Sequence, residues 1–155
     1  MRGKQAPKRA LNPDPKYNDL TVAKFINYVM RHGKKTVAQK IIYGAMDIIA
    51  DKTQAAPMET FDKAMKNVQP TVEVKSKRVG GANYQIPMQV RTERRIFLGF
   101  RWLIAAAEAK KGRPMAEKLA GEIMAAANNE GDAIKKKMDV QRMAEANRAF
   151  AHFAR

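Results

Sequence analysis

The stretch from Thr71 to Trp102 constrains the fold most, because the residue pattern there leaves helical spacing and then returns to it. Its first part, up to Val90, is rich in β-forming residues and contains a Gly80-Gly81 pair. The segments on both sides have helical periodicity, so two strands formed here have no other sheet to join. The sequence therefore predicts a mainly α-helical fold with one protruding β-hairpin, at about residues 71–90, between the third and fourth helices.

The apolar residues of the predicted hairpin share even numbers, and this suggests a register. They are Val72, Val74, Ile86, Met88 and Val90. A register that places all of them on one face pairs residues whose numbers add to an even value, which requires a loop of odd length. We therefore expect the loop Gly80-Gly81-Ala82, with Val74 opposite Met88. The other face would then carry Glu73, Lys75, Lys77, Gln85 and Gln89.

Apolar residues at helical spacing outside the hairpin predict a bundle of about six helices in one domain, residues 20–155. Gly33, Pro57, Pro70, Gly112 and Pro114 lie at the expected helix boundaries, where proline starts and glycine ends are common. Residues 1–19 contain three prolines and several basic residues, so they are expected to form an extended basic tail.

The predicted fourth helix, from about Thr92, separates charge from apolar surface. At about 100° per residue, its apolar side chains fall on one half and its arginines on the other. The arginine half carries Arg91, Arg94, Arg95 and Arg101. Arginine binds phosphate oxygens with a planar fork and stacks on bases, so this face is a candidate nucleic-acid contact. Trp102 projects beside the arginines, where it either packs under a neighbouring element or stacks on RNA.

The charge balance indicates a polyanionic partner. Thirty Lys and Arg residues against 15 Asp and Glu give a net charge of +15 at pH 7. Neutralised phosphates release condensed counterions, which favours binding of such a chain to nucleic acid. The segment Gly44–Pro70 has three bases and four acids, so it carries −1 and the remainder carries +16. We expect this segment to face away from the polyanion.

Several function classes are disfavoured. The chain has no cysteine, its two histidines are distant in sequence, and no P-loop or catalytic Ser–His–acid pattern stands out. We therefore expect no enzyme activity, no metal site, no cofactor and no small-molecule substrate. No apolar run is long enough to span a bilayer and no signal peptide is visible, so no membrane partner is expected. The remaining alternative from composition is an architectural DNA-binding protein with a basic β-arm.

Two long motifs in the expected order carry a family resemblance. The first is PTVEVKSKRVGGANYQIP, residues 70–87, followed by the arginine-rich helix and RWLIAAA; the second is MAEANRAFAHF, Met143–Phe153. The chain resembles the small-subunit ribosomal protein seven family of bacterial or organellar type over essentially its entire length. Lys77 stands where family members commonly carry an arginine, which keeps the charge but lacks the bidentate fork.

The resemblance implies a structural protein of the small ribosomal subunit that binds the 3′ major domain of its rRNA and helps nucleate assembly of the head. It also implies a position near the exit-site tRNA and the mRNA path, with ribosomal proteins eleven and nine as neighbours. The expected location is the ribosome, in the cytoplasm or in an organelle.

Together, charge and resemblance predict three groups of contact residues. The rRNA contacts are expected at the tail, two basic corners, the hairpin and the fourth helix: Arg2, Lys4, Lys8, Arg9, Lys34, Lys35, Lys75, Lys77, Arg78, Arg91, Arg94, Arg95, Arg101, Lys110, Lys111 and Arg113. The hairpin tip, facing tRNA or a neighbouring protein, is Gly80, Gly81, Ala82, Asn83 and Tyr84. C-terminal contacts to RNA or protein are expected at Lys135, Lys136, Lys137, Arg142 and Arg148. Whether the last helix packs on its own chain or on a partner stays open.

Overall fold

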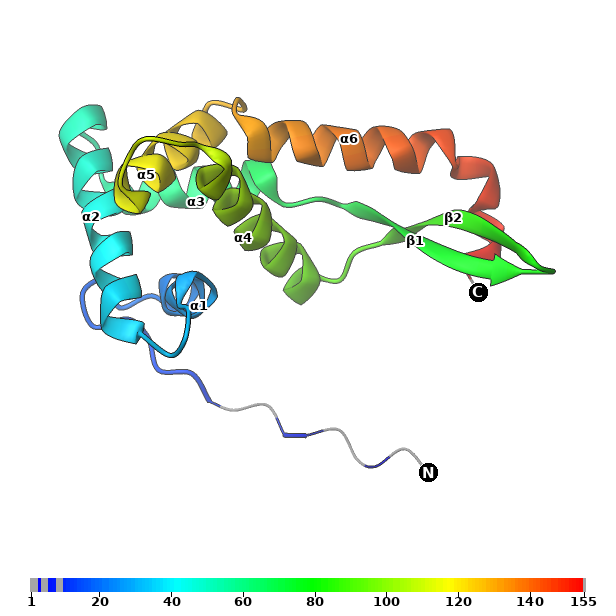
Figure 1. The fold of residues 1–155 in the computed structure, drawn as a ribbon, viewed down its shortest axis with the longest axis horizontal. Coiled ribbons are helices and arrows are strands. Elements are labelled where there is room, and N and C mark those ends of the chain that lie inside the picture. The colour runs from blue at the N-terminus through cyan, green and yellow to red at the C-terminus, as the bar shows by residue number, and fades with distance from the viewer. Residues whose placement is uncertain (1–2, 4–5, 8–9, 155) are drawn as a thin grey trace. The chain divides into compact units, whose positions relative to one another are not determined.

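The computed structural model describes residues 3, 6–7 and 10–154 and confirms the predicted fold class (Figure 1). It is mainly helical, with a two-stranded antiparallel hairpin between the third and fourth helices. The chain divides into two compact units, residues 1–39 and 40–155, which are described separately.

The first unit contains the helix α1, Leu20–Val29. The carboxylate of Asp19 caps it, because its Oδ1 accepts hydrogen bonds from the backbone N–H groups of Thr21 at 2.6 Å and Val22 at 2.8 Å. The helix ends before the predicted Gly33, since Met30 is already extended. Gly33, with φ of 72°, instead forms the turn that precedes α2, Lys35–Thr53.

The second unit is built on a helical group made of α3 (Pro57–Val68), α4 (Thr92–Ala109) and α5 (Met115–Ala127). These three helices pack on one another, and α6 (Asp132–Ala146) also contacts each of them. The large side chains buried here include Phe61, Phe100, Leu103, Leu119 and Ile123. Burying each such side chain contributes about 1.5–3 kcal/mol, so this group is the main source of stability in the unit.

The hairpin consists of β1 (Val72–Val79) and β2 (Ala82–Gln89). The predicted odd-length loop is wrong: Val79 lies opposite Ala82, and the turn contains Gly80 and Gly81 alone. Both glycines have positive φ, 56° and 91°, as a two-residue hairpin turn with matching twist requires. The two-residue glycine turn therefore determines the strand register, and the alternation of apolar residues does not.

The observed register shifts every predicted pair by one residue. Val74 lies opposite Pro87, and Lys75 lies opposite Ile86, so the even-numbered apolar residues of the two strands fall on opposite faces. The expectation of one apolar and one polar face is therefore wrong. A hairpin covered by other elements does not need a single apolar face, and here α6 contacts both strands while the 3₁₀ helix η1 (Arg148–Ala154) contacts β2.

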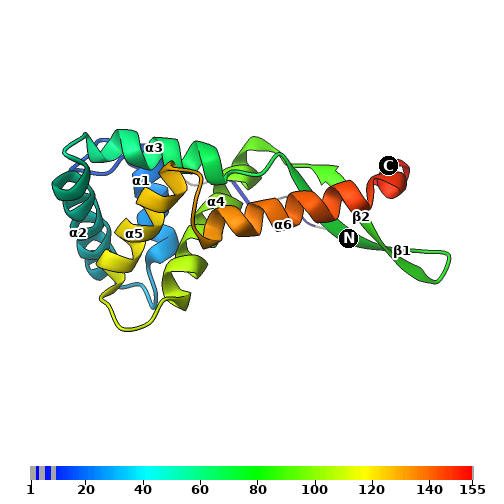
Figure 2. The same cartoon turned by 90° about the horizontal axis from the view of Figure 1, so that it is seen from above.

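The last helix answers the question that the sequence left open, because it packs on its own chain. Both views show α6 running along the hairpin, with η1 beyond it against the strands (Figures 1 and 2). Ile86 of β2 is buried. The hairpin thus projects from the helical group with the C-terminal segment packed against it.

Candidate nucleic-acid interface

The hairpin and the first half of α4 form one continuous basic segment. Residues 71–102 contain seven bases and two acids, a net charge of +5. Most of the cations are exposed to solvent: Lys75, Lys77, Arg78, Arg91, Arg94 and Arg101. This segment is the candidate nucleic-acid interface, because it combines exposed arginines with a ribbon that projects from the helical group (Figure 1).

Hydrogen bonds join the base of the hairpin to α4. The Val90 N–H donates to the Thr71 carbonyl at 3.0 Å, and Nε of Arg95 donates to the Val90 carbonyl at 2.9 Å. Glu73 lies on the same junction, 3.3 Å from Nε of Arg94 and 3.2 Å from Nζ of Lys75. The ribbon and the arginine-bearing helix are therefore held in a defined relation, and Arg95 contributes to that junction.

Arg94 is oriented by two contacts without being buried. Its guanidinium lies 4.6 Å from the centre of the Phe97 ring, in addition to its pairing with Glu73. Its side chain is 47% exposed, whereas that of Glu73 is 13% exposed. A planar guanidinium with part of its fork in solvent keeps donors available for phosphate oxygens.

The predicted hairpin tip divides into an exposed part and a part that faces the chain itself. Gly80–Asn83 are exposed. Tyr84 is half-buried, with its ring centre 5.1 Å from that of Phe150 and 5.5 Å from that of Phe153. Nζ of Lys77 donates to the Phe153 carbonyl at 2.9 Å. The C-terminal aromatic pair therefore anchors η1 on the hairpin, a contact that sequence reasoning missed.

Helix α5 contains a buried acid that was not expected. The Glu122 side chain is 0% exposed and forms an ion pair with Nζ of Lys110. Its Oε1 accepts a hydrogen bond from the Ala133 N–H at 2.9 Å. Gly131 passes so close that an added Cβ would lie 2.7 Å from Oε1. Lys110 thus has an intramolecular partner, while Lys111 and Arg113 are exposed.

A signal for Glu122 was present in the sequence. Glu122 lies three residues after Leu119 and four before Ala126, within the buried face of α5. A carboxylate at such a position must be paired and hydrogen-bonded, which points to a nearby lysine or arginine.

The predicted C-terminal cations have different environments. Lys135 pairs with Asp132 at 3.1 Å, and Lys136 is exposed. Lys137 is half-buried and its Nζ donates to the Asn67 carbonyl at the end of α3. Burial lowers the pKa of the Lys137 ammonium below its ordinary value of 10.5. Arg142 is 80% exposed and lies 3.8 Å from Asp139.

The remaining predicted basic residues belong to the first unit. Lys34 and Lys35 are exposed at the turn before α2. The tail residues Arg2, Lys4, Lys8 and Arg9 lie outside the described residues.

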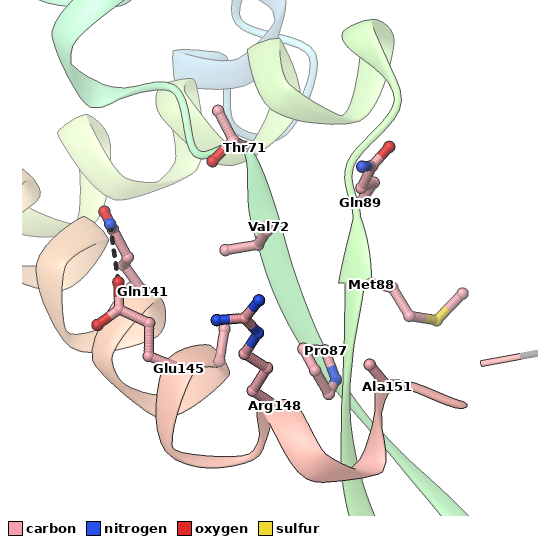
Figure 3. A pocket seen from close by; sticks show the side chains of 10 residues that line it. Thr71, Val72, Pro87, Met88, Gln89, Gln141, Glu145, Arg148 and Ala151 are labelled. Carbon is pink, nitrogen blue, oxygen red and sulfur yellow. Dashed lines mark hydrogen bonds between the residues drawn. The ribbon is translucent and has the colours of Figure 1, made fainter. Parts of the chain in front are cut away.

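A cavity of about 470 Å³ lies between the base of the hairpin and the C-terminal segment (Figure 3). Residues of β1, β2, α6 and η1 line it, and Arg148 is among them. Among the described residues, no cluster of three or more His, Cys, Asp and Glu side chains suited to a metal ion was found. Within the same part of the chain, no helix is long and apolar enough to cross a membrane.

Comparisons with known proteins match nearly the whole chain. The sequence model of the family described as "Ribosomal protein S7p/S5e" matches residues 1–148. The small ribosomal subunit protein uS7 of Thermotoga maritima is 60% identical over 153 residues, covering 99% of each chain. The protein of the same name from Caldanaerobacter subterraneus subsp. tengcongensis is 58% identical over 147 residues, covering 95% of this chain and 94% of its own.

A third relative, uS7 of Afipia carboxidovorans, is 51% identical over 152 residues, covering 98% of this chain and 97% of its own. Identity at this level over full length far exceeds what a shared basic composition would produce. Family membership favours a ribosomal role over the architectural DNA-binding alternative, and it agrees with the expectation that the chain is not an enzyme. The chain belongs to the ribosomal protein S7p/S5e family, whose matched relatives are the small ribosomal subunit proteins uS7.

Proposed function

We propose that the chain binds the 3′ major domain of small-subunit rRNA and helps nucleate assembly of the subunit head. We further propose that it lies near the exit-site tRNA and the mRNA path, with ribosomal proteins eleven and nine as neighbours. It would act while bound to the ribosome, in the cytoplasm or an organelle. Family membership and the distribution of exposed cations support this proposal.

The main observation that supports rRNA binding is the exposed basic surface formed by the hairpin and α4. Lys75 and Arg78 are exposed on the ribbon, Arg91 is exposed at the N-cap of α4, and Arg94 and Arg101 are exposed on α4 itself. The junction through Glu73 and Val90 holds the two elements together. Such a surface suits RNA, since proteins recognise structured RNA mostly through shape and the phosphate backbone.

The proposed contact residues fall into exposed cations and cations that already have a partner within the chain. Lys34, Lys35, Lys111, Arg113, Lys136 and Arg142 are exposed and remain proposed RNA contacts. Lys110 and Lys137 have intramolecular partners, so we assign them positioning roles at the ends of α4 and α3. Lys135 pairs with an exposed carboxylate, which RNA phosphate can displace.

The exposed hairpin turn is narrow enough to enter a confined binding site on tRNA or a neighbouring protein. Gly80, Gly81 and Ala82 have little or no side chain, so the ribbon ends in a narrow tip. A narrow tip with Arg78 beside it can approach a nucleic-acid backbone closely. We therefore keep Gly80–Asn83 as the proposed contact with tRNA or a neighbouring protein, and assign Tyr84 to the internal aromatic cluster.

Salt-dependent binding titrations test the rRNA proposal. The chain is titrated with a 3′ major domain rRNA fragment and with duplex DNA of equal length at several salt concentrations. We expect tighter binding to the rRNA at every salt concentration, and each phosphate contact should add about 0.7–0.9 to the salt slope. Equal affinity for the two nucleic acids would contradict the specific proposal.

Paired alanine variants locate the interface. Arg94→Ala with Arg101→Ala should weaken rRNA binding and reduce the salt slope by about 1–2, because two proposed phosphate contacts are lost. The matched control is Lys63→Ala with Lys66→Ala, which removes the same charge from exposed positions of α3. Equal losses in both double variants would show that net charge, and not the α4 face, determines binding.

A further inference from the structure

The cavity beside the hairpin has walls from four elements that are distant in sequence. Val72 begins β1 and Thr71 precedes it, while Pro87, Met88 and Gln89 come from β2. The opposite wall is formed by α6 and η1. Its volume of about 470 Å³ lies within the roughly 300–1,000 Å³ range of small-molecule sites, which is large enough for one nucleotide.

Two charged side chains of opposite sign line an otherwise largely apolar cavity. Figure 3 shows Glu145 on the α6 wall and the Arg148 side chain extending toward Val72 and Pro87. Nε2 of Gln141 donates to Oε1 of Glu145 at 3.1 Å, which orients the carboxylate. Arg148 has no ion-pair or hydrogen-bond partner among the described residues, so its guanidinium donors remain available to a ligand.

We propose that this cavity binds one unstacked base of the bound RNA, with Arg148 and Glu145 as its polar contacts. The inference deepens the proposed function and rests on it, since an RNA partner supplies the base. Unpaired bases in loops and bulges are the parts of RNA that proteins read with side chains. Val72, Pro87 and Met88 offer apolar surface to the faces of the base.

Guanine matches the two charged groups best. Its O6 and N7 accept hydrogen bonds from an arginine fork, the commonest specific contact to this base. Its N1–H and N2–H groups can both donate to a carboxylate, which has only acceptors. The other bases offer fewer groups that satisfy both side chains at once. A guanine therefore gives the largest set of matched hydrogen bonds in this cavity.

Methyl-group NMR of the full chain tests the proposal with 5′-GMP as the probe. Added GMP should shift the methyl signals of the cavity-lining Val72, Met88, Ala144 and Ala151, and it should bind more tightly than AMP or UMP. Inorganic phosphate at equal ionic strength should leave these signals in place. Arg148→Gln should weaken GMP binding about tenfold, because one charged hydrogen-bonding pair is lost.

Two further variants separate the cavity from general charge. Lys66→Gln removes the same charge from an exposed position of α3 that neither lines the cavity nor belongs to the proposed RNA contacts, so GMP binding should be unchanged. Ala151→Trp fills the cavity while keeping every charge, so it should abolish the GMP-induced shifts. Circular dichroism and denaturant unfolding of each variant confirm that it is folded.

Several outcomes would overturn the inference. These are shifts caused equally by phosphate, equal losses in Arg148→Gln and Lys66→Gln, or cavity methyl signals that no nucleotide moves. The 3′ major domain rRNA fragment is titrated in parallel with the unmodified chain. If the fragment binds but GMP does not reach the cavity, the base site alone is refuted, and a side chain of a neighbouring protein becomes the better occupant. If the fragment itself does not bind, the proposed function fails.

Discussion

The helical group α3–α5 and the hairpin arm, defined as β1, β2 and η1, use the same kinds of residue in opposite ways. In the helical group, aromatic side chains such as Phe61 and Phe100 are fully buried, and Lys110 is paired with a buried carboxylate. In the arm, Tyr84 and Phe153 are half-buried in a small cluster, and Lys75 and Arg78 are exposed. Stability is concentrated in the first region and availability for binding in the second.

The difference shows that charge alone does not identify a binding residue. Lys110 and Lys111 are adjacent in sequence, yet Lys110 joins Glu122 whereas Lys111 is exposed. Lys137 likewise lies near exposed Lys136 but donates to the end of α3. A cation that satisfies a buried acceptor holds the helices in place, and only its exposed neighbours remain free to neutralise phosphate.

The largest expected effect is on the core of the helical group. Phe100→Ala should lower the free energy of unfolding by about 3–5 kcal/mol, because it removes a fully buried aromatic side chain and leaves a cavity. Urea unfolding followed by circular dichroism measures this change. The adjacent exposed Arg101→Ala should change stability by less than about 0.5 kcal/mol. Similar values for the two variants would remove the distinction between core and surface in α4.

The second effect tests the buried acid. Glu122→Ala should cost about 1–3 kcal/mol, since it leaves the Ala133 N–H without its acceptor and Lys110 without its partner. Glu130→Ala, at an exposed position in the loop before α6, is the control and should be nearly neutral. A neutral Glu122→Ala would mean that the buried pair contributes nothing to the packing of α5 and α6.

The third effect is local to the arm. Tyr84→Ala should weaken the arm locally, because its aromatic contacts contribute about 0.5–1.5 kcal/mol each. It should lower global stability by only about 1 kcal/mol or less, because the arm lies outside the main core. Amide hydrogen exchange should show faster exchange in β1 and β2 with unchanged protection in α5. Uniformly faster exchange throughout the second unit would show instead that the arm and the helical group unfold together.

The smallest effect concerns the pH dependence of stability. Burial lowers the pKa of Lys137 in the folded chain. At pH values between this lowered pKa and 10.5, the unfolded chain therefore binds more protons than the folded chain. The free energy of unfolding relative to Lys137→Met should therefore rise with pH through this window, and the gain should be lost as pH falls through the folded pKa. Parallel denaturant unfolding of both proteins between neutral and high pH measures the difference, and a flat difference would refute it.

Local sequence rules predicted the elements of the fold well. Pro57 and Pro70 bracket α3 as expected, and α4 begins at Thr92 with its arginines largely exposed. The register of the hairpin was wrong because the apolar pattern was given precedence over the Gly80-Gly81 turn. The candidate rRNA contacts and the single domain expected from residue 20 onward stay predictions.

The sequence by itself determined the helices, the hairpin, the basic charge and the family, because periodicity, turn residues and short sequence motifs are local properties of the chain. Only the tertiary structure decided that η1 packs on the hairpin, that Glu122 takes Lys110 as its partner, and that Arg148 lines a cavity. Each of these facts joins residues from different elements, and Tyr84 and Phe153 lie 69 residues apart in the sequence. Such contacts depend on how elements pack, and spacing along the chain does not encode that directly.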